Sequence, residues 1–258
     1  MLQMADSEPT GSSNSLISFL LQVEGYYASL MRQALPVEAG LGGRLLCVGE
    51  LDEDGRALMV AGNIAGVASL AVRADPASQK QAIREGVADF LVTNLDEAIR
   101  ILKNEIRKRE AVAVCVGVAP ETIEKEMLDR GVLPDLVRDP GAVGTPDSAV
   151  VFGGRPAVVA PLGPAMGESV LSWSVDEAPA QWLPRLDAIA MGYLVADESL
   201  GTQVARRWLR LAPRYLGRLA RNVRVLRCSA TAAKAIAERK RTGVESGEIS
   251  VPVRIEVV

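Results

Sequence analysis

The chain has 258 residues, of which 48% are hydrophobic, and its formal net charge is −3. This length fits one large domain or two small ones, and the hydrophobic content excludes wholesale disorder. The weak negative charge gives no reason to expect a polyanionic partner, so no nucleic acid is predicted as a ligand. The sequence contains no histidine, which excludes catalytic or metal sites built on that residue.

Cysteine content and hydropathy indicate the compartment. The three cysteines are odd in number and have no short spacing, which is typical of a reducing compartment, and we expect a cytoplasmic protein. No stretch reaches the roughly 18 apolar residues that a membrane span requires, so no membrane contact is predicted. The polar residues 1–14 lack the basic end and apolar core of a signal peptide, and we expect them to form a disordered tail.

An N-terminal helix is predicted within residues 15–40. Apolar residues recur at helical spacing from about Ser15 to Leu35, and Pro36 follows directly. The apolar stripe leaves two arrangements open, packing on the rest of the chain or packing against a second copy. We expect a homo-oligomer.

Residues 41–160 alternate between continuous apolar strands and helical segments. Two helix starts are marked by capping residues, because Asp75 precedes Pro76 and Asn94 lies three residues before Glu97. Such alternation is typical of a parallel sheet that is covered on both faces. The predicted fold class is α/β, with a doubly wound, mostly parallel, Rossmann-like sheet.

Residues 161–258 are predicted to be mostly helical and to end in a strand. Two helices are expected within 184–222, separated near Pro213, which cannot continue a helix without a kink. Another helix is expected over about 230–241. The final segment ISVPVRIEVV alternates like a strand, and Pro252 marks it as an edge strand.

The first strand-to-helix turn is the first place to seek a ligand, because a dinucleotide fold has glycines there that let the pyrophosphate approach. Here the turn GELDEDG over 49–55 keeps glycine only at its two ends, and its four carboxylates would repel an anion. The turn argues against NAD and is typical of a solvated acidic helix start with Asp54 as the cap. A calcium loop is the alternative, but its closing acidic ligand would fall on Ala61, so no metal is predicted.

The end of the second strand gives another test of dinucleotide binding. A dinucleotide enzyme usually has an acidic residue there to bind the ribose, and this chain has Arg73. The arginine could suit a 2′-phosphate, or it could pair with an acid of the neighbouring turn. The candidate ligand site at the carboxyl edge of the sheet comprises Gly49, Glu50, Asp54, Gly55, Arg73, Gly117 and the Gly/Pro-rich loop at 139–145, which begins with Asp139.

Arginines recur every three or four residues from Arg206 to Arg227. A stripe of this kind is usually a solvated helix face. A phosphate-bearing ligand or the acidic patch of a partner is the alternative.

The stretch VADFLVTNLDEAIRILKNEIRKREAVAVCVGVAPETIEKEMLDRGVLPDLVRD resembles the central domain of urocanase (urocanate hydratase). Its segments TNLDEAI, GVAPE and RGVLPDLVRD correspond to the TSLDDAL-type, GNAAD-type and RGVRPDMVTD segments of that family. The clear resemblance spans about 42–139. It implies a Rossmann-like domain and, in the family, a tightly held NAD⁺ that acts as an electrophile in the hydration of urocanate.

Departures from the family pattern put that activity in doubt. The glycine-rich turn is represented mainly by Gly55, the ribose-binding Glu falls on Arg73, and the Asn of the GNAAD turn falls on Val118. The cofactor loop TDQTSAHD becomes RDPGAVGT over 138–145 and lacks its histidine. The family's catalytic domain and active-site cysteine have no recognisable counterpart, and the chain has about half the family's length.

Three functions fit these observations. The first is a stand-alone urocanase-related domain without hydratase activity, which binds a small-molecule ligand or a protein partner at the carboxyl edge of its sheet. The second is a sugar-phosphate isomerase of the SIS type, whose phosphate site would have to be built from the arginine helix. The third is an interaction subunit of a separate catalytic chain.

Overall fold

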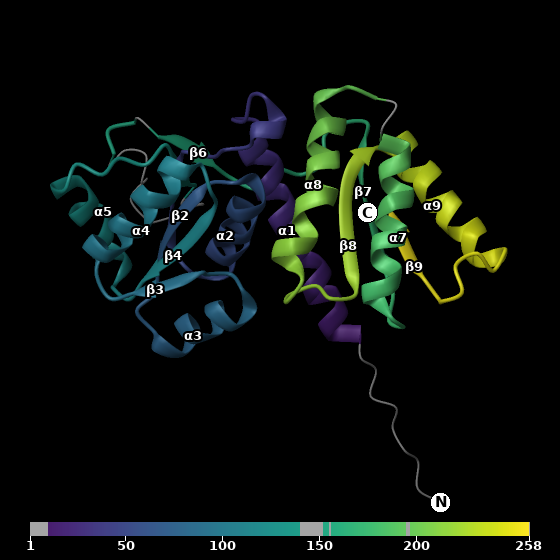
Figure 1. Cartoon of the computed structure of the whole chain (residues 1–258), viewed down its shortest axis with the longest axis horizontal. Helices are drawn as coiled ribbons and strands as arrows, with labels where there is room; N and C mark the ends of the chain where they lie inside the picture. Colours follow the sequence, from purple (N-terminus) through teal and green to yellow (C-terminus); the bar gives the residue numbers. More distant parts are fainter. Residues whose placement is uncertain (1–9, 140–151, 155, 195–196, 258) are drawn as a thin grey trace, which may run out of the picture.

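The computed structural model describes residues 10–139, 152–154, 156–194 and 197–257 of the chain. Two sheets form two halves, and the helix α1 (Thr10–Met31) lies between them (Figure 1). The helix begins before Ser15, so residues 10–14 are helical and the prediction of a disordered tail was wrong for them, whereas residues 1–9 lie outside the described ranges. No helix in those ranges has the length and apolar character needed to cross a bilayer.

The N-terminal half contains a six-stranded sheet in the order β3-β4-β2-β1-β5-β6, in which every described strand pair is parallel. Its strands are β1 (Leu45–Glu50), β2 (Ala68–Val72), β3 (Phe90–Val92), β4 (Val112–Val116), β5 (Leu136–Arg138) and β6 (Ala157–Val159). The helices that alternate with them are α2 (Glu53–Ala65), α3 (Pro76–Glu85), α4 (Leu95–Lys108) and α5 (Pro120–Asp129), and the short 3₁₀ helix η1 (Val37–Ala39) precedes β1. The predicted Rossmann-like fold class is confirmed.

The predicted capping residues start two of these helices. The Asp75 side chain accepts a hydrogen bond from the backbone amide of Ser78 at 2.8 Å, and the Asn94 side chain accepts one from Glu97 at 2.9 Å. Pro76 occupies the first turn of α3, where its missing N–H costs nothing. Local sequence therefore fixes where α3 and α4 begin.

The apolar stripe of α1 is buried inside the chain. Leu20, Val23, Tyr27 and Leu30 have no exposed surface, and α1 packs on α2 of the parallel half. The first of the two predicted arrangements, packing on the rest of the chain, is confirmed. This face is therefore not available to a second copy of the chain.

The C-terminal half has more strand than predicted. It contains an antiparallel sheet in the order β8-β7-β9, made of β7 (Glu168–Ser174), β8 (Val223–Ser229) and β9 (Arg254–Val257). The helices α7 (Pro179–Leu194), α8 (Leu200–Leu216) and α9 (Ala230–Glu245) pack against it. Strand β9 lies at an edge as predicted, and it begins two residues after Pro252.

The predicted helix boundary near Pro213 was wrong. Pro213 lies inside α8, and the interruption between helices falls after α7 ends at Leu194. Because α8 ends at Leu216, Pro213 sits in its last turn, where little helix remains for the ring to disturb.

Candidate functional site

The parallel sheet brings the predicted site residues to one edge, since all its strands end there. Gly49 and Glu50 end β1, Arg73 follows β2, Gly117 follows β4, and Asp139 follows β5. The chain crosses from one side of β1 to the other between β4 and β5, which places the topological switch point between β1 and β5. Residues 140–145 of the predicted loop lie outside the described ranges.

Gly49 has a conformational role at this edge. The register of β1 against β2 shifts between Cys47 and Gly49, and Gly49 has a φ of 73°, a left-handed conformation that favours glycine. The bulge turns the end of β1 toward α2.

The acidic turn satisfies the N-terminus of α2 with its own carboxylate. Asp52 is the cap, and its Oδ1 accepts a hydrogen bond from the backbone amide of Gly55 at 2.7 Å. Asp54, which the sequence predicted as the cap, instead accepts a hydrogen bond from Gln22 of α1. The capping prediction was wrong because Asp52, not Asp54, lies three residues before an unpaired amide of the first turn. A carboxylate therefore occupies the position at the helix N-terminus where a pyrophosphate would bind.

Both arginines at this edge are paired with acids of the turn. Arg138 contacts Asp52 through two hydrogen bonds, at 2.5 and 3.3 Å, and Arg73 contacts Glu50 at 3.1 Å. The pairing of Arg73 with an acid of the turn, one of the two predicted alternatives, is confirmed. Neither guanidinium presents an unbalanced charge to a phosphate.

Helix α1 lies beside the acidic turn, with Gln22 and Tyr26 next to Asp54. Burial, and to a smaller extent the Asp54 carboxylate, raise the pKa of Tyr26 to about 12. Within the described ranges, no three acidic or cysteine side chains converge in a way that could hold a metal ion.

Gly55 lets α2 approach the end of β1. A Cβ on Gly55 would overlap the carbonyl oxygen of Glu50 and lie 3.0 Å from the Arg138 guanidinium.

We expect Gly55→Ala to lower the free energy of unfolding by about 1–3 kcal/mol, because the helix would have to move away from the strand. Urea denaturation measures this, with Gly192→Ala in α7 as the control, since a Cβ there would have no contact within 4 Å among the described residues. An unchanged stability in Gly55→Ala would show that glycine is not needed for packing.

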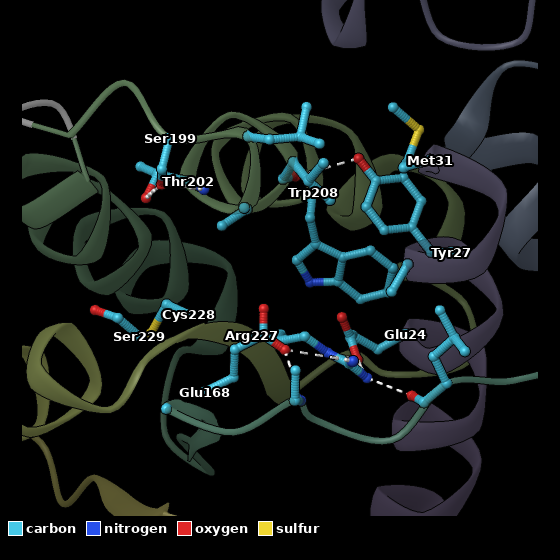
Figure 2. Close-up of a pocket in the computed structure, with 18 of the residues that line it drawn as sticks. Glu24, Tyr27, Met31, Glu168, Ser199, Thr202, Trp208, Arg227, Cys228 and Ser229 are labelled. Carbon is cyan, nitrogen blue, oxygen red and sulfur yellow. Dashed lines mark hydrogen bonds and ion pairs between the residues drawn. The ribbon is translucent and has the colours of Figure 1, made fainter. Parts of the chain in front are cut away.

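A second candidate site lies on the other side of α1. A cavity of about 330 Å³, partly open to solvent, is lined by α1, the segment from Leu162 to Glu168, the first turns of α8 and the end of β8 (Figure 2). One wall is aromatic, because the rings of Tyr27 and Trp208 lie 5.0 Å apart at an angle of 51°. A cavity of this size, mostly apolar with a few polar groups, is typical of small-molecule sites.

The cavity contains a buried ion pair. Glu24 is 3% exposed, and its Oε2 accepts hydrogen bonds from Nη2 and Nε of Arg227 at 2.6 and 2.9 Å. Arg227 also donates to the backbone carbonyls of Leu162 and Gly163, at 2.6 and 2.7 Å. Burial raises the pKa of Glu24 to about 7, against the opposing effect of Arg227. A buried acid with a pKa near neutrality in a cavity is a frequent property of functional sites.

Sequence reasoning missed this site. Glu24 interrupts an otherwise apolar helix stripe between Val23 and Gly25, and this interruption was the available signal. Arg227 was grouped with the arginine stripe, although the alternation in VRVLRCS is strand-like.

The other arginines of that stripe are engaged separately. Arg206 pairs with Glu198, Arg210 pairs with Glu38, and Arg207 is buried and donates to the carbonyl of Ala65 at 3.0 Å. The stripe is therefore not a simple solvated face, and it does not form one cluster that could hold a phosphate.

Comparison with known proteins bears on the parallel half. A sequence profile described as "Urocanase Rossmann-like domain" matches residues 23–148. The S-methyl thiourocanate hydratase of Variovorax sp. (strain JCM 16519 / RA8) is 31% identical over 142 residues, which are 54% of this chain and 26% of that protein. The chain thus aligns with about a quarter of the length of this relative. The resemblance predicted from the sequence is confirmed, and the half of the chain that carries the parallel sheet is similar to the Rossmann-like domain of urocanases.

Proposed function

We propose that this chain is a urocanase-related protein that binds a small ligand in the cavity beside α1 and does not hydrate urocanate by itself. The observation that carries the proposal is the cavity of about 330 Å³ with the buried Glu24–Arg227 pair in its wall. A buried ion pair is expensive to maintain and does not require a cavity beside it for stability. A ligand that binds in the cavity would explain why the buried Glu24–Arg227 pair lies in its wall.

The carboxyl edge of the sheet is the less favoured position for the ligand. Asp52 occupies the N-terminus of α2, and both Arg73 and Arg138 are paired with carboxylates. A dinucleotide would have to displace these contacts before its phosphates gained any. Because this edge is already occupied by the protein's own carboxylates, we do not propose for this chain the hydratase activity in the relative's name.

Thermal shifts with a panel of small molecules test the proposal. We expect NAD⁺ to leave the melting temperature unchanged, and a cavity ligand at about 100 times its Kd to raise it by about 5–10 °C. The variant Ala28→Phe fills the cavity from α1 and should abolish the shift, whereas Ala180→Phe, at an exposed position of α7, should keep it. Native mass spectrometry of the purified chain identifies a co-purifying ligand and the oligomeric state.

The outcomes separate the two positions. Stabilisation by NAD⁺ that is equal in the parent chain and in Ala28→Phe would place a dinucleotide at the sheet edge and overturn the proposal. A ligand whose shift disappears only in Ala28→Phe would support the cavity.

A further inference from the structure

The wall of the cavity offers few free hydrogen-bond donors. Arg227 directs Nε and one Nη2 hydrogen to Glu24, the other Nη2 hydrogen to Leu162 and an Nη1 hydrogen to Gly163. Its five N–H groups are therefore almost fully committed. An anionic ligand would have to break these bonds to use this guanidinium.

Four other polar side chains of the wall are also committed. The Tyr27 hydroxyl donates to the carbonyl of Val204 at 3.2 Å, and the Trp208 indole donates to Val225 at 2.7 Å. Both hydroxyls at the start of α8, those of Ser199 and Thr202, donate to Asp197. These bonds lower the pKa of Asp197, with the Thr202 hydroxyl as the largest contribution.

Two carboxylates, in contrast, keep capacity to accept hydrogen bonds. Both bonds from Arg227 reach Oε2 of Glu24, and no hydrogen bond from a described residue reaches its Oε1. Glu168 accepts a bond from the amide of Ala165 at 2.9 Å on Oε2, while its Oε1 faces Gly201 in the first turn of α8. Figure 2 shows the Glu24 carboxyl group beside Arg227 and below the Trp208 ring.

The two carboxylates, Glu24 and Glu168, carry more negative charge than Arg227 balances. Glu24 and Glu168 share one guanidinium, which is largely buried, since Nη1 of Arg227 also lies 3.8 Å from Glu168. The second cation of the lining, Arg32, is exposed, so solvent and salt screen its charge. One further positive charge inside the cavity would balance the two carboxylates.

We propose that the cavity binds a small organic cation with an aromatic or apolar body, such as an arylalkyl amine or an amidine. Its N–H groups donate to Glu24 and Glu168, and its body lies against Tyr27 and Trp208. A cation beside aromatic rings gains the attraction of their negative faces. This inference rests on the proposed function, because it names the ligand class for the same cavity.

The proposal predicts the direction of a pH dependence. The titratable and charged groups that face Glu24 are Arg227 of β8, Glu168 at the start of β7 and Tyr27 of α1. Burial, and to a smaller extent Glu168, raise the pKa of Glu24 to about 7, and Arg227 opposes them. Because the cation binds the ionised carboxylate, its affinity should fall as the pH drops below about 7, and binding near pH 7 should release protons.

Three matched probes test the ligand class: benzylamine, benzyl alcohol and benzoate share one ring and differ in charge. Calorimetric titration at pH 8 should show benzylamine binding about tenfold or more tightly than either of the others, the range expected for charge-assisted hydrogen bonds. Glu168→Gln keeps the shape and removes the charge, and it should weaken benzylamine binding about tenfold. Glu177→Gln, an exposed carboxylate outside the cavity, is the matched control and should leave binding unchanged.

The outcomes distinguish the inference from the function on which it rests. Benzoate or benzyl alcohol binding as tightly as benzylamine, with loss in Ala28→Phe, would keep the cavity as the site and overturn the cation. Binding of none of the three probes would overturn both. An equal effect of Glu168→Gln and Glu177→Gln would also contradict the assigned contact.

Discussion

Arg227→Met should lower the free energy of unfolding by about 3–5 kcal/mol, the cost of leaving a buried charge without its partner. The side chains of Arg227 and Glu24 are 12% and 4% exposed, so solvent cannot replace the lost contact. The substitution also frees the carbonyls of Leu162 and Gly163, which Arg227 holds against α1. Urea denaturation at pH 8 measures the loss.

The pH dependence identifies the cause of that loss. Burial raises the pKa of Glu24 to about 7, so the carboxyl group is ionised at pH 8 and largely protonated at pH 5.5. A neutral carboxyl group needs no guanidinium, and Arg227→Met should therefore cost less at pH 5.5 than at pH 8. The double variant Glu24→Met with Arg227→Met removes both charges and should recover a large part of the loss.

Arg210→Met is the matched control for this prediction. Arg210 pairs with Glu38, but the two side chains are 53% and 58% exposed, and such pairs contribute about 0–1 kcal/mol. A loss in Arg227→Met that is no larger than in Arg210→Met would mean that solvent reaches Glu24.

The parallel half was predictable because its signals are local. The capping residues Asp75 and Asn94 mark the starts of two helices. A continuous apolar strand such as β4 indicates a strand that is buried on both faces of the sheet. The approach of α2 to β1 at Gly55 could likewise be inferred from a glycine after a strand.

The C-terminal half and the cavity were not predictable in the same way. Strand β8 alternates arginines with apolar residues, and its arginines continue the three-to-four-residue spacing of α8, so a helical pattern hid a strand. The cavity joins α1 to β8 through Glu24 and Arg227, which lie 203 residues apart in the sequence. A contact of that separation leaves no trace in local periodicity.

Pairing of charges was the least predictable feature. The sequence placed four carboxylates in the acidic turn and left the pairing of Arg73 with one of them as an alternative, but only the fold shows that Arg138 meets Asp52. Arg138 lies 86 residues after Asp52, and it reaches the turn because β5 pairs with β1.

Lys240→Met should raise the free energy of unfolding by about 2–4 kcal/mol at pH 7, because it removes a buried ionisable group that lacks a hydrogen bond. Lys240 has no exposed surface, and its Nζ has no hydrogen-bond partner among the described residues. Asp187 is the main counter-charge, but it already accepts bonds from Trp173 and Arg224, at 3.2 and 3.3 Å. Met is similar to Lys in volume and carries no charge to desolvate.

Two effects act in opposite directions on the Lys240 amine. Its Nζ lies 3.0 Å from the centre of the Trp173 ring, which favours the charged form by about 2 kcal/mol. Burial disfavours that form by several kcal/mol per ion, and lowers the pKa of Lys240 to about 6. Desolvation is the larger effect, so the amine is neutral in the folded protein at pH 7.

The sign of the pH dependence follows from that comparison. The folded pKa of about 6 lies below the unfolded value of about 10.4, so the unfolded chain binds the proton more tightly throughout that window. Stability of the parent chain should therefore rise with pH between about 6 and 10, and the advantage of Lys240→Met should shrink over the same range. Urea denaturation at pH 7 and pH 9.5 measures both, with Lys234→Met, an exposed position of α9, as the control. A destabilised Lys240→Met at both pH values would show instead that the amine is charged and that Trp173 and Asp187 hold it in that form.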